Sequence, residues 1–178
     1  MRAVRKSGYD AHVSILHRHQ NPTVLKKYRR RAPALDWLRA VLREPYGDCG
    51  EVDLVALHEY EVLRYLQPFG IVPRVRGLGL RSISMDFAGN PIDRNAGSLD
   101  DSLEEEGRRI WSALQEAGVA HNDIRDCNIL QMDGRVTLVD FTMADCPWFS
   151  VSSRHPDPSW GRFEMDNRLL NLSGGPLD

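Results

Sequence analysis

The sequence predicts an α+β fold with a small antiparallel sheet near the N-terminus. Three observations support this class of fold. Short stretches of aliphatic and β-branched residues, at 11–16 and 22–28, are bounded by turn-forming residues. Longer segments, such as 33–43 and 99–117, repeat apolar residues at helical spacing. A final pair of short apolar stretches within 128–139 is separated by a tight turn.

The first two strands are predicted within residues 8–31. The stretch 11–16 alternates loosely, Asn21-Pro22 marks a turn, and 22–28 forms the second strand. Successive side chains of a strand point to opposite faces, so Lys26 and its neighbour Lys27 should face opposite sides.

Two helices are predicted next, at residues 33–43 and 51–67. In the first, Leu35, Leu38 and Leu42 share one face. In the second, one face carries Val55, Glu59, Val62, Leu63 and Leu66. An unpaired buried carboxylate is costly, so the acid on this apolar face needs a partner.

Two more strands are predicted at residues 72–77 and 82–87, around a turn at Gly77-Leu78-Gly79. Residues 90–98 are polar and rich in turn formers, which indicates a linker between two parts of the chain. The amphipathic helix 99–117 follows. Ser98 and Asp101, three residues apart, resemble a capping box at its start.

A β-hairpin is predicted after this helix. Its strands are Asn128–Gln131 and Arg135–Val139, and Met132-Asp133-Gly134 forms the turn. A hairpin brings its two ends side by side. The residues that enter and leave it should therefore lie next to each other.

Those end residues carry oxygen-bearing side chains. Asn128 enters the hairpin, Asp140 leaves it, and Asp123 lies on the loop just before. Converging carboxylate and amide oxygens suit Mg²⁺, which keeps water and phosphate as its other ligands. The alternative is an ordinary hairpin with turn-forming Asp and Asn residues at its ends.

The composition bounds the class of protein. The chain has 178 residues, 42% hydrophobic and 27% charged, enough for one domain or two small lobes. The sequence has no run of eighteen apolar residues, so no membrane span is predicted. Its basic N-terminus is not followed by an apolar segment, so no signal peptide is predicted. Three cysteines (Cys49, Cys127 and Cys146) are odd in number and lack metal-binding spacing. We therefore expect reduced thiols and a cytoplasmic location.

Charge is distributed unevenly along the chain. The net charge is only −2, which argues against a general polyanion binder. Residues 1–31, however, contain nine Lys or Arg and a single acid, Asp10. This part of the chain favours contact with phosphates, nucleic acid or an anionic surface.

The stretch His121-Asn122-Asp123-Ile124-Arg125-Asp126-Cys127-Asn128, with Asp140-Phe141-Thr142 twelve residues later, resembles the catalytic and metal loops of protein kinases. The sequence departs from that pattern at Asn122, where the family usually has Arg, and at Thr142, where it usually has Gly. Thr lacks the conformational freedom of Gly, so a stiffer metal loop is expected.

The resemblance implies a minimal two-lobed protein-kinase-like fold. It has a nucleotide-binding N-lobe at residues 1–89 and a reduced helical C-lobe at 90–178 that carries the catalytic and metal loops. The short C-terminal part makes the chain similar to compact, atypical kinases such as lipopolysaccharide-core sugar kinases and RIO-like kinases. Residues 164–172 are expected to form one helix, and Trp148, Phe149, Trp160 and Phe163 to cap a small core.

The resemblance also assigns roles in the C-lobe. Asp123 would orient and deprotonate a substrate hydroxyl, and Asn128 and Asp140 would hold Mg²⁺. Arg125 would stabilise charge on the transferring phosphoryl group; the alternative is a surface Arg paired with Asp126. His121 is expected to act as a structural hydrogen-bonding residue.

In the N-lobe, Val24-Leu25-Lys26 resembles the strand whose Lys pairs with the α- and β-phosphates of ATP, and Glu59 would hold that Lys. The alternatives are a solvated Lys26, and a surface Glu59 with Glu61 as the partner or with neither acid paired. The stretch Met85-Asp86-Phe87-Ala88-Gly89 resembles the hinge, which makes Asp86 and Phe87 the adenine-binding positions; the alternative is a plain strand end followed by a Gly turn. The Gly-rich phosphate loop is degenerate, since only Gly8 remains in Ser7-Gly8-Tyr9-Asp10.

The resemblance therefore implies an ATP- and Mg²⁺-dependent phosphotransferase. Its acceptor would be a hydroxyl of a protein, sugar or other small molecule. The alternative is a pseudokinase, a nucleotide-binding or interaction module without turnover, and the degenerate Gly-rich loop favours it. A lesser alternative is a nucleic-acid-binding protein that uses the basic N-terminal part.

Overall fold

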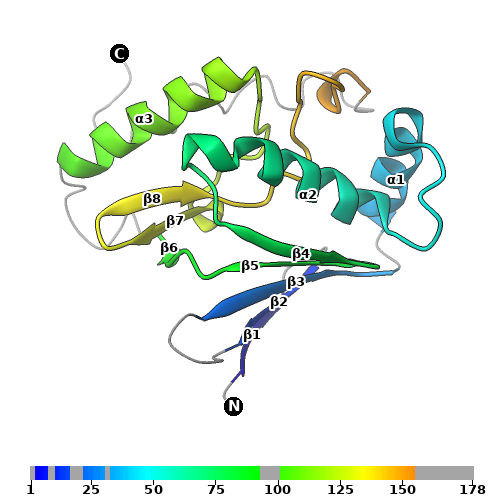
Figure 1. The fold of residues 1–178 in the computed structure, drawn as a ribbon, viewed down its shortest axis with the longest axis horizontal. Coiled ribbons are helices and arrows are strands. Elements are labelled where there is room, and N and C mark those ends of the chain that lie inside the picture. The colour runs from blue at the N-terminus through cyan, green and yellow to red at the C-terminus, as the bar shows by residue number, and fades with distance from the viewer. Residues whose placement is uncertain (1–2, 8–10, 17–21, 31–32, 93–100, 155–178) are drawn as a thin grey trace. The chain divides into compact units, whose positions relative to one another are not determined.

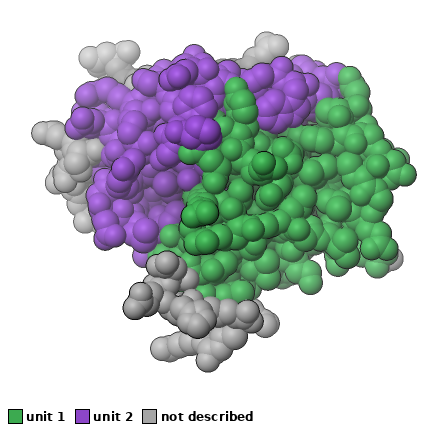
Figure 2. Space-filling view, viewed as in Figure 1, with its two compact units in different colours: residues 1–67, 73–87 green, residues 68–72, 88–178 purple. Residues whose placement is uncertain are grey.

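The structure is a computed structural model that describes residues 3–7, 11–16, 22–30, 33–92 and 101–154. The chain forms two compact units, coloured separately in Figure 2. The first unit contains residues 1–67 and 73–87, and the second contains residues 68–72 and 88–178. Strands and helices occur in both, which confirms the α+β class.

The first unit is built on a five-stranded antiparallel sheet (Figure 1). Its strands are β1 (Ala3–Ser7), β2 (Ala11–Leu16), β3 (Thr23–Tyr28), β4 (Val75–Gly79) and β5 (Ser82–Asp86). Their order in the sheet is β1-β2-β3-β5-β4. The predicted opposition of Lys26 and Lys27 is confirmed: Lys26 is buried and Lys27 is exposed.

Two features of this sheet differ from the prediction. Strand β1 was not predicted, because its sequence is short and half polar; it forms by pairing along its whole length with β2. The stretch Gly77–Gly79 belongs to β4 and is not a turn. Small residues are required there, since a Cβ on Gly79 would lie 2.7 Å from Oγ of Ser82 across the ladder.

Helix α2 (Leu54–Leu66) packs against β4 and β5, and against α1 (Pro33–Tyr46). Its predicted face is buried: Val55, Glu59, Val62, Leu63 and Leu66 are all inaccessible to solvent. The helix begins at the N-cap Asp53, whose carboxylate accepts a hydrogen bond from the N–H of Val55 at 3.0 Å. Helix α1 runs to Tyr46, three residues further than predicted, and includes Pro45 in its last turn.

The second unit holds helix α3 (Asp101–Ala117) and a three-stranded sheet (Figure 1). The strands are β6 (Asn90–Pro91), β7 (Ile129–Met132) and β8 (Arg135–Leu138), in the order β6-β7-β8. The predicted hairpin is β7–β8. Asp133 (φ 53°) and Gly134 (φ 77°) form its turn, both in the left-handed region that such two-residue turns require. The two-residue strand β6 was not predicted.

Helix α3 is fixed to the hairpin by polar contacts. Oε2 of Glu106 accepts the N–H of Val136 at 2.9 Å, and Glu106 pairs with Arg109 at 2.8 Å. Arg109 in turn donates to the carbonyl oxygens of Val136 and Gly70. These bonds hold β8 and the segment before β4 against one helix.

The segment after Asp140 folds back on the second unit. Asp145 and Ala120 exchange two backbone hydrogen bonds, and the Asp145 carboxylate accepts from the N–H of Ser152 at 2.8 Å. Phe149 is buried as predicted. Trp148 is 42% exposed, so its predicted place in a core is wrong: this position lies on the outer side of the turn at 146–149.

Several predicted features lie outside the described residues. They are the Gly8–Asp10 loop, the capping Ser98, Trp160, Phe163 and the helix at 164–172. Among the described residues, no helix is both long and apolar enough to span a bilayer.

Candidate active site

Asn128 is the best-anchored of the predicted site residues. It ends the short 3₁₀ helix η2 (Asp126–Asn128), immediately before β7, and is 5% exposed. Its Nδ2 donates to the backbone carbonyl of Asp123 at 2.9 Å and to Oδ2 of Asp123 at 3.2 Å. These two bonds use the amide N–H groups and leave Oδ1 with only a long contact, 3.5 Å, to Sγ of Cys127.

Asp140 lies beside Asn128, as the hairpin predicts. The N–H of Val139 donates to the carbonyl oxygen of Asn128 at 3.0 Å, and Asp140 is the next residue. Its backbone has a φ of 69°, in the left-handed region that Asp tolerates better than most residues. The hydroxyl of Thr142 donates to Oδ1 of Asp140 at 3.0 Å and so orients the carboxylate.

His121 ties the two loops together. Its Nδ1 accepts the N–H of Asp123 at 3.2 Å, so the proton is on Nε2, which donates to the carbonyl of Val139 at 3.0 Å. The ring is fully buried, and its centroid lies 4.4 Å from that of Phe141. This environment gives His121 the structural role expected for it.

Asn122 makes a second connection between the loops. Its φ is 62°, and its Nδ2 donates to the carbonyl oxygen of Met143 at 3.1 Å. Asn is one of the few residues other than Gly that enter the left-handed region readily. The residue that departs from the kinase pattern is therefore suited to the backbone it occupies.

Arg125 pairs with Asp123 and not with Asp126, the partner considered in the alternative reading. Its guanidinium donates to Oδ2 of Asp123, and this hydrogen bond is the main cause that raises the pKa of Arg125 above its ordinary value. The charge of Asp140 raises the pKa further, which places that carboxylate in the same electrostatic environment.

The first unit holds the other predicted pair. Nζ of Lys26 lies 2.8 Å from Oε2 and 3.1 Å from Oε1 of Glu59. Lys26 is 7% exposed and Glu59 is fully buried, so neither alternative reading of these two residues holds. The ion pair joins β3 to α2, and the ammonium also lies 5.2 Å from the ring centroid of Tyr28.

Asp86 is the last residue of β5, and Phe87 follows it. The side chain of Asp86 pairs with Arg76. The backbone N–H of Asp86 donates to the carbonyl oxygen of Arg74 at 2.8 Å, and that of Phe87 to the carbonyl oxygen of Pro22 at 3.0 Å. Any contact with adenine at these two positions would therefore use carbonyl oxygens, or would replace an existing hydrogen bond.

The donor atoms near Asn128 fit a hard cation. An amide oxygen and a carboxylate at the end of one hairpin suit Mg²⁺ with water and phosphate completing its shell. Within the described ranges, no group of three or more His, Cys, Asp or Glu side chains is placed to hold a metal by itself. A metal bound here would thus depend on ligands from another molecule.

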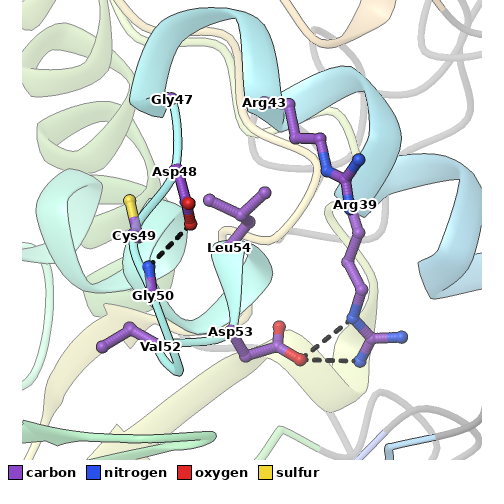
Figure 3. A pocket seen from close by; sticks show the side chains of 9 residues that line it. All are labelled: Arg39, Arg43, Gly47, Asp48, Cys49, Gly50, Val52, Asp53 and Leu54. Atoms are coloured by element: carbon purple, nitrogen blue, oxygen red, sulfur yellow. Dashed lines mark hydrogen bonds and ion pairs between the residues drawn. The ribbon is translucent and has the colours of Figure 1, made fainter.

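A separate cavity of about 460 Å³ lies in the first unit, between the end of α1 and the start of α2. Figure 3 shows the Arg39–Asp53 ion pair on one side of it and the 47–52 loop on the other. None of the residues predicted to act lines this cavity.

Sequence reasoning missed two contributors to the candidate site. Thr142 was noted only as a departure from Gly, yet its hydroxyl orients Asp140. Asn122 was noted only as a missing Arg, yet it bridges the loops. Both residues that depart from the kinase pattern have side chains that can form hydrogen bonds, and this property could have indicated their roles from the sequence.

Comparisons with known proteins bear on the fold. No family model matches the sequence, and no curated protein matches it. Among the solved structures, 446 chains match. One is the Rio2 kinase–ADP/Mg²⁺–phosphoaspartate complex from Chaetomium thermophilum, with a TM-score of 0.61 and 17% sequence identity.

That alignment covers 95% of this chain and 52% of the Rio2 chain, so this protein spans about half the length of the protein it matches. The molecule therefore has a protein-kinase-like fold. Within that class its likeness is to a RIO kinase, one of the compact atypical kinases expected from the sequence.

Proposed function

We propose that this protein is an ATP- and Mg²⁺-dependent phosphotransferase that transfers the γ-phosphate to a hydroxyl of a protein or small molecule. The observation that carries the proposal is the arrangement at the open end of the β7–β8 hairpin. There Asp123 and Asn128 are hydrogen-bonded to each other, and Asp140 follows the residue bonded to Asn128.

Asp123 would orient the acceptor hydroxyl and take its proton. Its Oδ2 accepts hydrogen bonds from Asn128 and Arg125, whereas Oδ1 makes none with the described residues. One oxygen would thus be held in place while the other receives the acceptor. Arg125, already beside Asp123, would stabilise negative charge on the phosphoryl group in flight.

Asn128 and Asp140 would hold the cation through Oδ1 of Asn128 and the carboxylate of Asp140. When bound, Mg²⁺ neutralises phosphate charge and fixes the geometry of the phosphate chain. Thr142 keeps the Asp140 carboxylate in one orientation before the metal arrives. This reduces the ordering needed on binding.

Lys26 would bind the α- and β-phosphates. Glu59 satisfies the buried ammonium, which would otherwise carry a large desolvation penalty. Asp86 and Phe87 would contact adenine through carbonyl oxygens. The solved Rio2 chain is a complex with ADP and Mg²⁺, which supports the same ligands for this fold.

A nucleotide-binding pseudokinase is the second candidate. The ion pair between Arg125 and Asp123 favours it, because the guanidinium occupies one carboxylate oxygen of the proposed base. For either candidate we propose a cytoplasmic location, consistent with three cysteines that form no disulfide.

ATP turnover by the purified chain tests the proposal. Wild type should release ADP in the presence of Mg²⁺, and Asp123→Asn should lower turnover at least ~100-fold, the usual scale for a general base. Asp133→Asn is the matched control. It removes a carboxylate from the turn of the same hairpin, where Asn also tolerates positive φ, and should keep full turnover.

If wild type shows no ATP turnover, the proposed phosphotransferase activity is contradicted. If Mg-ATP then still raises the melting temperature, the pseudokinase is supported. Because the matched Rio2 structure contains phosphoaspartate, phosphate found on the chain itself should be checked for lability to hydroxylamine, which cleaves acyl phosphates.

A further inference from the structure

Basic residues predominate among the described residues that line a second cavity of the first unit. It measures about 540 Å³ and is lined by His12, Lys27, Tyr28, Arg29, Arg30 and Arg81. Five of these six side chains are basic and none is acidic. We call this cavity the basic groove.

The sheet brings these residues together from distant parts of the sequence. Across neighbouring strands, His12 of β2 lies opposite Lys27 of β3, and Lys27 lies opposite Ser82 of β5. Arg81 precedes Ser82, and its carbonyl oxygen accepts the N–H of Tyr28 at 2.8 Å. Directly opposed residues on adjacent strands have Cβ atoms roughly 5 Å apart, so the register places His12 beside Lys27.

The groove is distinct from the predicted nucleotide-binding residues. Lys26 is buried on one face of β3 with Glu59, and the exposed Lys27 points to the other face. The proposed ATP chemistry therefore makes no use of the groove.

Three of the cations that line the groove have no acidic partner among the described residues. Among the described residues, the side chains of Lys27, Arg30 and Arg81 make no hydrogen bond or ion pair. Other cations of the same unit do: Lys26 pairs with Glu59, Arg39 with Asp53 and Arg76 with Asp86. Adjacent unpaired cations repel one another, and a bound anion relieves that repulsion.

The shape and composition of the groove indicate the class of anion. Arg and Lys clusters bind phosphate through several charge-assisted hydrogen bonds. The ring of Tyr28 is 1% exposed, so the tyrosine that lines the groove offers no face on which a nucleic-acid base could stack. Because His12, Lys27 and Arg30 are exposed, the groove is open, which suits a phosphate carried on a larger molecule.

We propose that the basic groove binds a phosphorylated side chain, phosphoserine or phosphothreonine, presented by another polypeptide. Recognition of phosphorylated segments by Arg clusters is a general mode of peptide binding. The phosphate would lie among Lys27, Arg30 and Arg81, the three cations without another partner. The site would act whether or not the chain turns over ATP.

Fluorescence anisotropy with a labelled phosphoserine peptide tests the proposal, alongside the unphosphorylated peptide and a labelled single-stranded RNA. Wild type should bind the phosphopeptide at least tenfold more tightly than the unphosphorylated form. Lys27→Ala and Arg81→Ala should each raise its dissociation constant about tenfold, the effect of losing one charge-assisted hydrogen bond.

Arg43→Ala is the control, since it removes an exposed guanidinium of the same unit that lies outside the groove and makes no side-chain hydrogen bond or ion pair among the described residues. Its phosphopeptide affinity should stay within about twofold of wild type. The proposal is overturned if wild type binds both peptides equally or neither, or if Arg43→Ala weakens binding as much as Lys27→Ala. Tighter binding of RNA, lost in the groove variants, would replace it with a nucleic-acid site.

Discussion

The side-chain amide of Asn128 donates to both the backbone carbonyl and the carboxylate of Asp123, at 2.9 and 3.2 Å. One buried residue thereby fixes the backbone of the loop and the side chain proposed as the base. The same contacts leave the amide oxygen of Asn128 available for a cation. The predicted base, Asp123, and the predicted metal ligand, Asn128, are therefore hydrogen-bonded to each other.

We predict that Asn128→Ala lowers the free energy of unfolding by about 1 to 3 kcal/mol, because the partly buried carbonyl of Asp123 loses its donor. Urea denaturation followed by circular dichroism measures this. Cys127→Ala changes the neighbouring exposed residue and should leave the midpoint within about 0.5 kcal/mol of wild type. Equal stability of wild type and Asn128→Ala would show that the bond does not organise the loop.

The buried Lys26–Glu59 pair gives a second prediction. Lys26→Met or Glu59→Gln alone should destabilise the protein by about 3 to 5 kcal/mol, because each substitution leaves the other buried charge without its oppositely charged partner. The double variant Lys26→Met/Glu59→Gln should recover part of that loss. Unfolding energies of the four proteins form a double-mutant cycle. Strictly additive losses would mean that the two residues are not coupled.

Glu106 should make stability depend on acid pH. The hydrogen bond from Arg109 is the largest cause that lowers the pKa of Glu106 below its ordinary value; burial opposes it, and the N–H of Val136 lowers the pKa further. A lowered pKa in the folded state contributes stability above the unfolded value. That contribution is lost as pH falls through the folded pKa.

We therefore expect Glu106→Gln to be less stable than wild type at pH 7 by about 1 to 3 kcal/mol, with the difference shrinking below pH 4.5. Urea denaturation at pH 7 and in the acid range measures it. Glu104→Gln is the control, because Glu104 pairs only with Arg108 on the exposed side of the same helix. A deficit that stays constant down to the lowest pH would refute the linkage.

Thiol reactivity should distinguish Cys127 from Cys146. Burial raises the pKa of Cys146 to about 11, so its thiol stays protonated at neutral pH, and Cys127 is exposed. Iodoacetamide should label Cys127 in the native protein within minutes and leave Cys146 unlabelled until urea is added, as mass spectrometry can measure. Equal labelling of both in the native state would contradict the buried position of Cys146.

The parts that could be predicted from the sequence rest on local spacing or on the kinase resemblance. The β7–β8 hairpin follows from two short apolar stretches around Asp133-Gly134, and hairpin geometry then places Asn128 beside Asp140. The Lys26–Glu59 contact spans 33 residues, and no local pattern joins them; the resemblance supplied that pair.

The missed features depend on partners distant in the sequence. Strand β1 is stabilised by its ladder with β2, and β6 by two residues of β7, so neither has a strong signal of its own. Gly77 and Gly79 are typical of a turn until Ser84 and Ser82 are placed opposite them. Arg125 had two acids within reach along the chain, and only the structure showed that Asp123 is its partner.

The measurement that tests the proposed function most directly is a Mg²⁺ titration of ATP turnover, at saturating ATP, for wild type and Asp140→Asn. Asn tolerates the positive φ at this position, so the variant removes the charge and keeps the backbone. We predict saturable Mg²⁺ dependence in wild type, at least ~100-fold lower turnover in Asp140→Asn, and an unchanged curve in Asp133→Asn. Turnover that is independent of Mg²⁺, or equal in wild type and Asp140→Asn, would contradict the phosphotransferase site described for this protein.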